Sequence, residues 1–494
     1  MGEETNKYYI GITLGPIHRF LGCAKSTRSI WASSYLFAYI GKHLIRKYYE
    51  NKRRILKPQI SDEMFSMHDG VGRFPDQYIF EVDKEFDIND LRKESDAVLD
   101  NLAYNIAQVL GEEQNEYEVN YYLKQVLRII IVKKSFLATM DDSDVVKAMQ
   151  GVLAEQECRD TFLSRESRNY LSEYFESKIP DMLLYVDAYG KECKGRMFDT
   201  IVECSAGNDY NGKKVDLIEG KLDNQLNPYQ KYIAFVAADG DSFGEMLSKQ
   251  KQFAIAVRKY NKQVNELVRS YGGEIIYQGG DDILFYAPLF SLDKGKAISE
   301  GKDILSLIAD IDNSLYKILN ESSLATDSPH LTISYGISVS YFKFPMGEAM
   351  EIAQRSLQEA KNSGKNRIVW TVRKHSGQTY GDVIDKSIPL AIRQSIDFIH
   401  DSLGDNDAFL HSVTHWLIGQ EAMLGTILSK ENNRERSDML DNYIQNCFNE
   451  PEHDKYKVFF DSMEKYLLAY SGDEGVNKLH VLMRYVELLK KKKS

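Results

Sequence analysis

Two apolar runs separated by two glycines and two aspartates constrain this chain more than any other stretch. Residues 274–277 and 283–286 are strand-like, and Gly279-Gly280-Asp281-Asp282 stands between them. A Gly-Gly pair between such runs predicts a hairpin turn, because glycine tolerates positive φ. The turn would present two carboxylates, and Mg²⁺ prefers one or two carboxylates with water and substrate phosphates completing its shell. A solvated acid pair at an ordinary turn is the competing interpretation of this motif taken alone.

A second acidic position lies upstream of the predicted hairpin. Residues 232–238 form a short apolar run that ends at Asp239-Gly240-Asp241. An acid delivered at the carboxyl end of a buried strand is typical of active sites in α/β sheets. An apparent helix, roughly residues 244–270, separates this strand from the hairpin, so the two would become neighbours in the sheet. The two acidic clusters together favour a metal site built from Asp239 with Asp281 or Asp282.

The order of elements from residue 232 onward predicts the split βαβ plan, which is the palm architecture. We therefore expect an α+β chain with two ferredoxin-like palm domains, a helical insertion and a C-terminal helical bundle. The length of 494 residues suits several domains. The expected domains are residues 1–88, the core of a first and degenerate palm; 89–230, a mainly helical insertion; 231–377, the second palm; and 378–494, a helical domain.

Two details of this plan bear on the sheets. Residues 117–134 are expected to be helical, although a strand at 128–132 remains open. From residue 378 onward the pattern predicts helices alone.

The composition limits the partners and the compartment. The net charge of −11 argues against a general nucleic-acid coat. Five cysteines form no regular framework, which suits a reducing cytosol. No signal peptide or membrane-length apolar run is evident. We expect a cytoplasmic protein with no membrane association.

Two lysines near the end of the second palm form a further candidate. Lys361 and Lys365 flank Ser363-Gly364 and are four residues apart, so they share a helix face. They could both reach a triphosphate. Helix C-capping is the simpler interpretation of lysines beside glycine and asparagine, but the acidic clusters upstream favour phosphate binding.

Taken together, these motifs resemble the nucleotidyl-cyclase palm shared with GGDEF diguanylate cyclases. The motifs are, in chain order, Asp239-Gly240-Asp241, the GGDD hairpin, Ser334-Tyr335-Gly336-Ile337 and Ala360-Lys361 with Gly364-Lys365-Asn366. The segment from Gly15 to Ser34 resembles something narrower, the first palm of the large polymerase–cyclase subunit of type III CRISPR effector complexes, of the III-B kind. Lys374-His375-Ser376-Gly377 also fits that subunit.

The resemblance implies cyclic oligoadenylate synthesis from ATP, switched on when a guide RNA pairs with target RNA. It implies partner subunits of the backbone, small and guide-end kinds. Asp239, Asp281 and Asp282 would be catalytic and, with the Gly240 carbonyl, would hold Mg²⁺ or Mn²⁺. The nucleotide-binding residues implied are Gly240, Ser242, Phe243, Gln278, Gly279, Gly280, Lys361 and Lys365.

Three departures from the family pattern carry expectations. We expect no HD nuclease, because the chain opens on the first palm strand and the dipeptides at His68, His400 and His453 lack the other residues of an HD site. Only Cys193 and Cys204 fall where the family's zinc module lies, so we predict no zinc.

The third departure concerns the acceptor. Gln278 stands before GGDD where relatives usually have a small residue, which opens S-adenosylmethionine as an alternative acceptor of AMP. A GTP-using diguanylate cyclase and a catalytically silent scaffold are the further alternatives.

Overall fold

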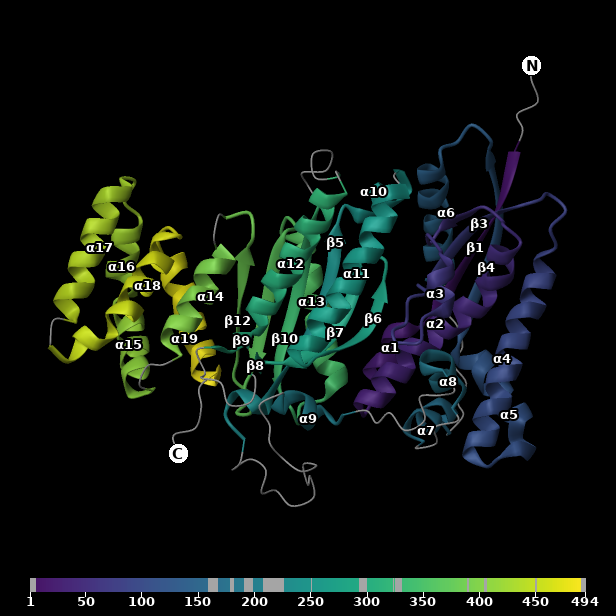
Figure 1. The fold of residues 1–494 in the computed structure, drawn as a ribbon, viewed down its shortest axis with the longest axis horizontal. Helices are drawn as coiled ribbons and strands as arrows, with labels where there is room; N and C mark the ends of the chain where they lie inside the picture. The colour runs from purple at the N-terminus through teal and green to yellow at the C-terminus, as the bar shows by residue number, and fades with distance from the viewer. Residues whose placement is uncertain are drawn as a thin grey trace.

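The computed structural model describes most of the chain and places three regions in order along its long axis (Figure 1). The described residues are 6–158, 168–177, 182–190, 199–207, 226–249, 251–292, 300–322, 324, 331–388, 391–403, 407–448 and 451–489. The first palm lies at one end, the second palm in the middle and a group of helices at the other end (Figure 1). The predicted α+β class is confirmed.

The first palm is a four-stranded antiparallel sheet with the order β2-β3-β1-β4, which is the ferredoxin-like order. Its strands are β1 (Asn6–Gly15), β2 (Ile55–Lys57), β3 (Gln77–Val82) and β4 (Arg128–Leu137). Its helices are α1 (Ile17–Gly22), α2 (Thr27–Glu50), α3 (Asp62–Ser66), α4 (Ile88–Leu110), α5 (Glu116–Val126) and α6 (Asp142–Glu157). Helices α2 and α4 pack on one face of the sheet, and α6 packs on the other.

The expectation of a helix over residues 117–134 is wrong in its second half. Helix α5 ends at Val126, and β4 then pairs with β1 along its whole length, from Asn6↔Leu137 to Gly15↔Arg128. The strand alternative left open at 128–132 is therefore the observed one. The Ile-Ile-Ile-Val run in β4 favours an extended backbone, since branched side chains pack well on a pleated surface.

Among the described residues after the first palm, three short α-helices occur: α7 (Tyr170–Glu176), α8 (Leu183–Tyr189) and α9 (Ile201–Ala206). The second palm then forms a six-stranded sheet with the order β12-β11-β10-β5-β7-β6. Its strands are β5 (Tyr232–Asp241), β6 (Glu274–Gly279), β7 (Asp282–Pro288), β10 (Thr332–Tyr341), β11 (Arg367–Arg373) and β12 (Thr379–Asp385). A separate short hairpin consists of β8 (Phe290–Ser291) and β9 (Lys302–Asp303). The helices of this palm are α10 (Phe243–Lys249), α11 (Lys251–Tyr271), α12 (Ile304–Glu321) and α13 (Met346–Asn362).

The two faces of the second sheet are covered by different helices, and β5 shows the division. Alternate residues of a strand point to opposite faces. Ala234, Val236 and Ala238 join the large core with α11 and α12. Ile233, Phe235 and Ala237 pack with α13 and α1. By this alternation Asp239 and Asp241, which follow Ala237 by two and four residues, belong to the α13 face.

The C-terminal region is helical, but it begins later than predicted. Residues 379–385 form β12, which pairs with β11 and extends the second sheet, so the expectation of helices alone after residue 378 is wrong there. The helices are α14 (Ala391–Ser402), α15 (Asp407–Gly419), α16 (Glu421–Leu428), α17 (Asn433–Cys447), α18 (Lys457–Leu468) and α19 (Asp473–Leu489). Within the described ranges, none of the helices has both the length and the apolar character that a membrane span requires.

The two palms meet through backbone as well as side chains. Gly347, at the start of α13, lies so close to the carbonyl of Gly22 in α1 that a Cβ at Gly347 would collide with it. The loop between α3 and β3 forms a second contact, because Gln278 N donates to Gly72 O at 3.3 Å and Arg269 donates to the Asp69 carbonyl at 2.7 Å. The first palm therefore touches the strand that leads into the GGDD turn.

A buried ion pair attaches α8 to the first palm. The Asp187 carboxylate accepts hydrogen bonds from Tyr35 Oη at 2.8 Å and from Lys42 Nζ at 3.0 Å. Both charged side chains are largely buried, with Lys42 7% and Asp187 16% exposed. Burial alone would raise the pKa of Asp187, but the neighbouring His43, whose Nε2 is 3.7 Å away, and the charge and hydrogen bond of Lys42 lower it to about 2.

We expect Asp187→Asn to destabilise the first palm by about 3 kcal/mol, because it leaves the Lys42 ammonium buried without a counterion. Urea unfolding followed by tryptophan fluorescence checks this, since Trp31 stacks on Tyr35 beside the pair. Since the folded-state pKa is depressed, the stabilisation is complete above the ordinary aspartate value of 3.8 and is lost as the pH falls toward 2. Asp83→Asn is the control: its pair with Arg53 is exposed and contributes about 0–1 kcal/mol. Equal effects of the two variants would contradict the prediction.

Candidate active site

Two of the predicted acids meet at the ends of neighbouring strands. Strands β5 and β7 are antiparallel, and Ala238 pairs with Ile283 as the last registered pair. One residue further along each strand stand Asp239 and Asp282, which therefore lie opposite each other. Both belong to the α13 face, because Ala237 and Leu284 beside them pack in the cluster with α13. The spacing predicted from the sequence thus brings these carboxylates together.

The turn that carries Asp281 differs from the Gly-Gly turn expected. Gly279 pairs with Asp282, so Gly280 and Asp281 are the two central residues, and only Gly280 has a positive φ, of 73°. Glycine at the first central position is the pattern of a type II′ turn, whose twist matches that of the flanking strands. Gly279 is needed for another reason: a Cβ there would collide with the Tyr277 hydroxyl group.

Lys361 lies against the acids rather than extending into solvent. Its ammonium is 2.7 Å from Asp239 Oδ2 and 2.9 Å from Asp241 Oδ1. It also donates to the backbone carbonyls of Asp239 at 3.0 Å and Gly240 at 3.1 Å. Lys361 stands in the last turn of α13, so the helix that covers this face delivers it.

Asp241 belongs to the acidic motif recognised in the sequence but was not among the predicted site residues, and the structure adds it to the site. It is 2% exposed. Besides Lys361, its carboxylate accepts hydrogen bonds from Thr332 Oγ1 at 2.6 Å, Ser334 Oγ at 2.9 Å and the Asn366 backbone N–H at 2.9 Å. Burial would raise its pKa, but these donors together lower the pKa below the ordinary value. The sequence did contain a signal for this residue: Asp241 stands two residues after Asp239, and this spacing in a strand places both side chains on the same face of the sheet.

The carboxyls of the turn crowd one another. Loss of water, and then the charge of Asp239, raise the pKa of Asp281 to about 6. The same two causes, with the charge of Asp281, raise the pKa of Asp282 well above 3.8. Asp282 is exposed, so solvent at the tip offsets part of this effect. Three carboxyls that disfavour one another's charge form a place where added positive charge is stabilising.

The first palm contributes charge to the same place. Asp76, immediately before β3, is a further negative charge that raises the pKa of Asp282. Lys57, at the end of β2, acts in the opposite direction on the pKa of Asp281. Lys57 Nζ also donates to Gln77 Oε1 at 3.2 Å. No motif in the sequence marked Asp76 or Lys57, because only the contact between the palms brings them to the hairpin.

Gln278 is not brought to the acids. The register of β6 shifts between Ile275 and Tyr277, so Tyr277 pairs with Leu284 and Gln278 pairs with Ile283. Ile283 belongs to the core with α11, on the face opposite the acids. The buried Gln278 amide accordingly donates from Nε2 to the Asn261 carbonyl in α11 at 2.8 Å. In this structure Gln278 braces the hairpin against α11.

The remaining predicted residues divide into two kinds. Phe243 is buried, packs edge-on against Phe253 and lies where a Cβ of Gly240 would be, so it fills the core beneath the loop. Ser242 and Lys365 are exposed and both have positive φ, of 67° and 66°. These two residues mark the loops after β5 and α13, on either side of Lys361.

The donor set at the strand ends fits a hard divalent cation. The Asp239 carboxylate and the Gly240 carbonyl already converge on one positive charge, and oxygen ligands of these kinds suit Mg²⁺ and Mn²⁺. Across the described part of the chain, no group of three or more His, Cys, Asp or Glu residues is yet arranged tightly enough to hold an ion. Of the two cysteines considered for zinc, Cys204 is buried in α9 and Cys193 lies outside the described residues.

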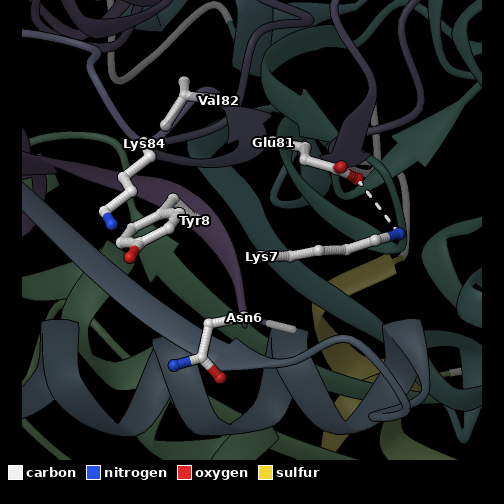
Figure 2. Close-up of a pocket in the computed structure, with 6 residues that line it drawn as sticks. All are labelled: Asn6, Lys7, Tyr8, Glu81, Val82 and Lys84. Atoms are coloured by element: carbon white, nitrogen blue, oxygen red, sulfur yellow. Dashed lines mark ion pairs between the residues drawn. The ribbon is translucent and has the colours of Figure 1, made fainter. Parts of the chain in front are cut away.

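A pocket of about 440 Å³ lies away from the acids, at the opposite end of the first-palm strands. Figure 2 shows its lining, with the ion pair between Lys7 and Glu81 at 3.9 Å. The lining residues are Asn6, Lys7, Tyr8, Glu81, Val82 and Lys84. The pocket lies at the start of β1 and the end of β3. Asp76, which lies near the candidate site, precedes β3 and is therefore at the other end of that strand. The pocket is therefore not part of the candidate site.

Two ferredoxin-like palms in contact, with carboxylates at adjoining strand ends of the second, define the class of paired palm-domain proteins. Family comparisons specify the class further. The profile described as "Cas10/Cmr2, second palm domain" matches residues 232–369. The profile described as "CRISPR-associated protein Cmr2, N-terminal" matches residues 9–130. Together they match more than half of the chain, and the chain belongs to the Cas10/Cmr2 family.

Solved structures share the fold at low identity. The apo state of a type III-B Cmr-beta complex matches with a TM-score of 0.56 and 10% identity, covering 89% of this chain and 77% of the other. Cmr-beta bound to cognate target RNA matches with a TM-score of 0.56 and 11% identity, covering 90% of this chain and 79% of the other. A Csm1–Csm4 cassette in complex with AMPPNP matches with a TM-score of 0.50 and 13% identity, covering 99% of this chain and 70% of the other. No curated protein matches the chain significantly.

Proposed function

We propose that this chain is the nucleotidyltransferase of a type III CRISPR effector complex and makes cyclic oligoadenylate from ATP when target RNA is bound. The observation that carries the proposal is the meeting of Asp239 and Asp282 at the ends of β5 and β7, with Lys361 beside them. Membership of the Cas10/Cmr2 family supports it. So do structures of the same fold solved with AMPPNP and with pppApA.

The residues of the site match the needs of adenylyl transfer. In this reaction an acceptor 3′-hydroxyl oxygen bonds to the α-phosphorus of ATP, its proton leaves, and the bond to pyrophosphate breaks. A divalent cation, when bound, neutralises phosphate charge and helps the leaving group depart. Asp239 and Asp282 with the Gly240 carbonyl would hold that cation, Asp281 stands beside it, and Lys361 and Lys365 would bind the triphosphate.

The proposed partners follow from the same relatives. The matched structures are complexes named Cmr-beta and Csm1–Csm4, and one of them holds cognate target RNA. We propose that this chain assembles with backbone, small and guide-end subunits on a guide RNA in the cytoplasm. The net charge of −11 favours an arrangement in which other subunits hold most of the guide RNA.

Product analysis by mass spectrometry tests this proposal. The assembled complex receives guide RNA, matching target RNA, Mg²⁺ and ATP, with and without S-adenosylmethionine. We expect rings of adenylate from ATP alone, because Gln278, the residue that suggested another acceptor, contacts α11 rather than the acids. We expect none without target RNA, as the family resemblance implies. A reaction with GTP replacing ATP serves as the control for nucleotide choice.

Each other outcome identifies a different function. A product that requires S-adenosylmethionine and carries one AMP would keep the metal chemistry and change the acceptor. Products from GTP alone would favour a diguanylate cyclase. No turnover of any nucleotide in the assembled complex would indicate a silent scaffold.

A further inference from the structure

The Lys361 ammonium lies among more oxygens than it has hydrogens to donate. Four oxygen atoms surround it: Asp239 Oδ2 at 2.7 Å, Asp241 Oδ1 at 2.9 Å, Asp239 O at 3.0 Å and Gly240 O at 3.1 Å. An ammonium has three N–H groups. Converging carbonyl and carboxylate oxygens are the usual surroundings of a bound cation. Lys361 therefore lies in a cation site made by the carboxyl end of β5.

Two of these oxygen ligands are also those proposed for the divalent cation. The Asp239 carboxylate and the Gly240 carbonyl cannot be shared at such distances by an ammonium and Mg²⁺, because the two positive charges would repel strongly. We infer that Lys361 is a built-in counter-cation, which fills the metal position until metal and nucleotide arrive together and displace it. This inference rests on the proposed function and concerns how the same site is loaded.

Asp241 is built to retain the lysine after displacement. It is buried, and its other hydrogen bonds come from Thr332, Ser334 and the Asn366 backbone, none of which involves Asp239. The Lys361 ammonium can therefore leave Asp239 while Asp241 remains a fixed anion beside it. Asp239, Asp281 and Asp282 repel one another's negative charge. A divalent cation neutralises more of this charge than the single charge of the ammonium does, so it can replace the ammonium at Asp239.

The phosphates of a nucleotide give the displaced ammonium a new partner. Metal and nucleotide then assist each other, because the metal frees Lys361 and the triphosphate binds it. Such coupling is reciprocal: whatever factor the nucleotide adds to metal affinity, the metal adds to nucleotide affinity. Without nucleotide, the lysine competes directly with the metal.

Mn²⁺ binding to the full chain, measured by electron paramagnetic resonance with no turnover, tests the inference. Lys361→Met keeps the length of the side chain and removes the charge. We expect its Mn²⁺ affinity without nucleotide to rise about tenfold over the unaltered protein, and the gain on adding AMPPNP to shrink. Lys361→Arg keeps the charge and should stay close to the unaltered protein. Lys93→Met is the matched control, since this lysine of α4 is 78% exposed and pairs with Asp90 rather than with the acids of the site.

The outcomes separate the inference from the proposed function. Equal Mn²⁺ affinity in Lys361→Met and the unaltered protein would overturn the role of Lys361 alone and leave the metal site standing. Absence of Mn²⁺ binding in every variant, even with AMPPNP, would overturn both. Asp241→Asn provides a second variant: because Asp241 retains the displaced lysine, its loss should hinder displacement, so Mn²⁺ affinity should fall in this variant while it rises in Lys361→Met. A rise in both variants would contradict the role given to Asp241.

Discussion

Replacing both turn acids, Asp281→Ala with Asp282→Ala, is expected to reduce nucleotide product by about three orders of magnitude. The remaining acids, Asp239 and Asp241, are already engaged by Lys361, so the double variant retains too few carboxylates for a divalent cation. The protein should still fold, because Asp282 is exposed and Asp281 is half-buried at a turn. Removal of mutually repelling carboxyls, whose pKa values are raised, should not lower its stability.

The measurement is product yield in the assembled complex together with a thermal unfolding curve. Glu351→Ala is the control, because this exposed glutamate of α13 pairs with Arg355 one turn away and should leave activity unchanged. A double variant that folds, assembles and keeps full activity would show that the metal assignment is wrong.

Gly336→Ala is expected to disturb both the fold and the site, although Gly336 touches no substrate. A Cβ at this position of β10 would collide with the Ala353 carbonyl and the Leu357 backbone nitrogen of α13. Both clashing atoms belong to the backbone of α13, which cannot move aside as a flexible side chain can, so the whole helix must shift. We expect a loss of about 3 kcal/mol in the free energy of unfolding, and the shift carries Lys361 away from Asp239.

Gly151→Ala is the matched control for this change. Gly151 is an exposed residue within α6, and nothing lies within 4 Å of a Cβ placed there. Alanine should stabilise that helix by about 0.5–1 kcal/mol. Denaturant unfolding and product yield of both variants provide the comparison. A folded Gly336→Ala protein with unchanged stability would show that α13 is less tightly packed on β10 than described here.

The acidic strand ends could be predicted from sequence because their information is local. Asp239 and Asp282 each adjoin a short apolar strand, and the antiparallel pairing of β5 with β7 follows from the split βαβ plan. Strands β4 and β12 could not be predicted in the same way. Thr379–Asp385 is a mostly polar edge strand whose structure depends on its pairing with β11, and the pairing of β4 with β1 decided between helix and strand.

The details of the site depend still more on tertiary contacts. The register shift in β6 turns Gln278 away from the acids, and nothing in the sequence around Ile276 marks it. The burial of Asp241 requires Thr332 and Ser334 of β10 and Asn366 in the turn before β11 to converge on it. Sequence periodicity assigns a residue to a face, but it does not supply the partners that the residue meets there.

The contact between Gly22 and Gly347 has a mechanical consequence. Helix α13 begins at this contact and carries Lys361 in its last turn, and its 17 residues span about 25 Å. A rigid helix pressed at one end on the first palm acts as a lever: a small rotation between the palms moves its far end. Because both palms are on one chain, dilution cannot separate them. A signal that changes the angle between the two tethered palms would therefore move Lys361 within one chain, and that movement does not depend on protein concentration.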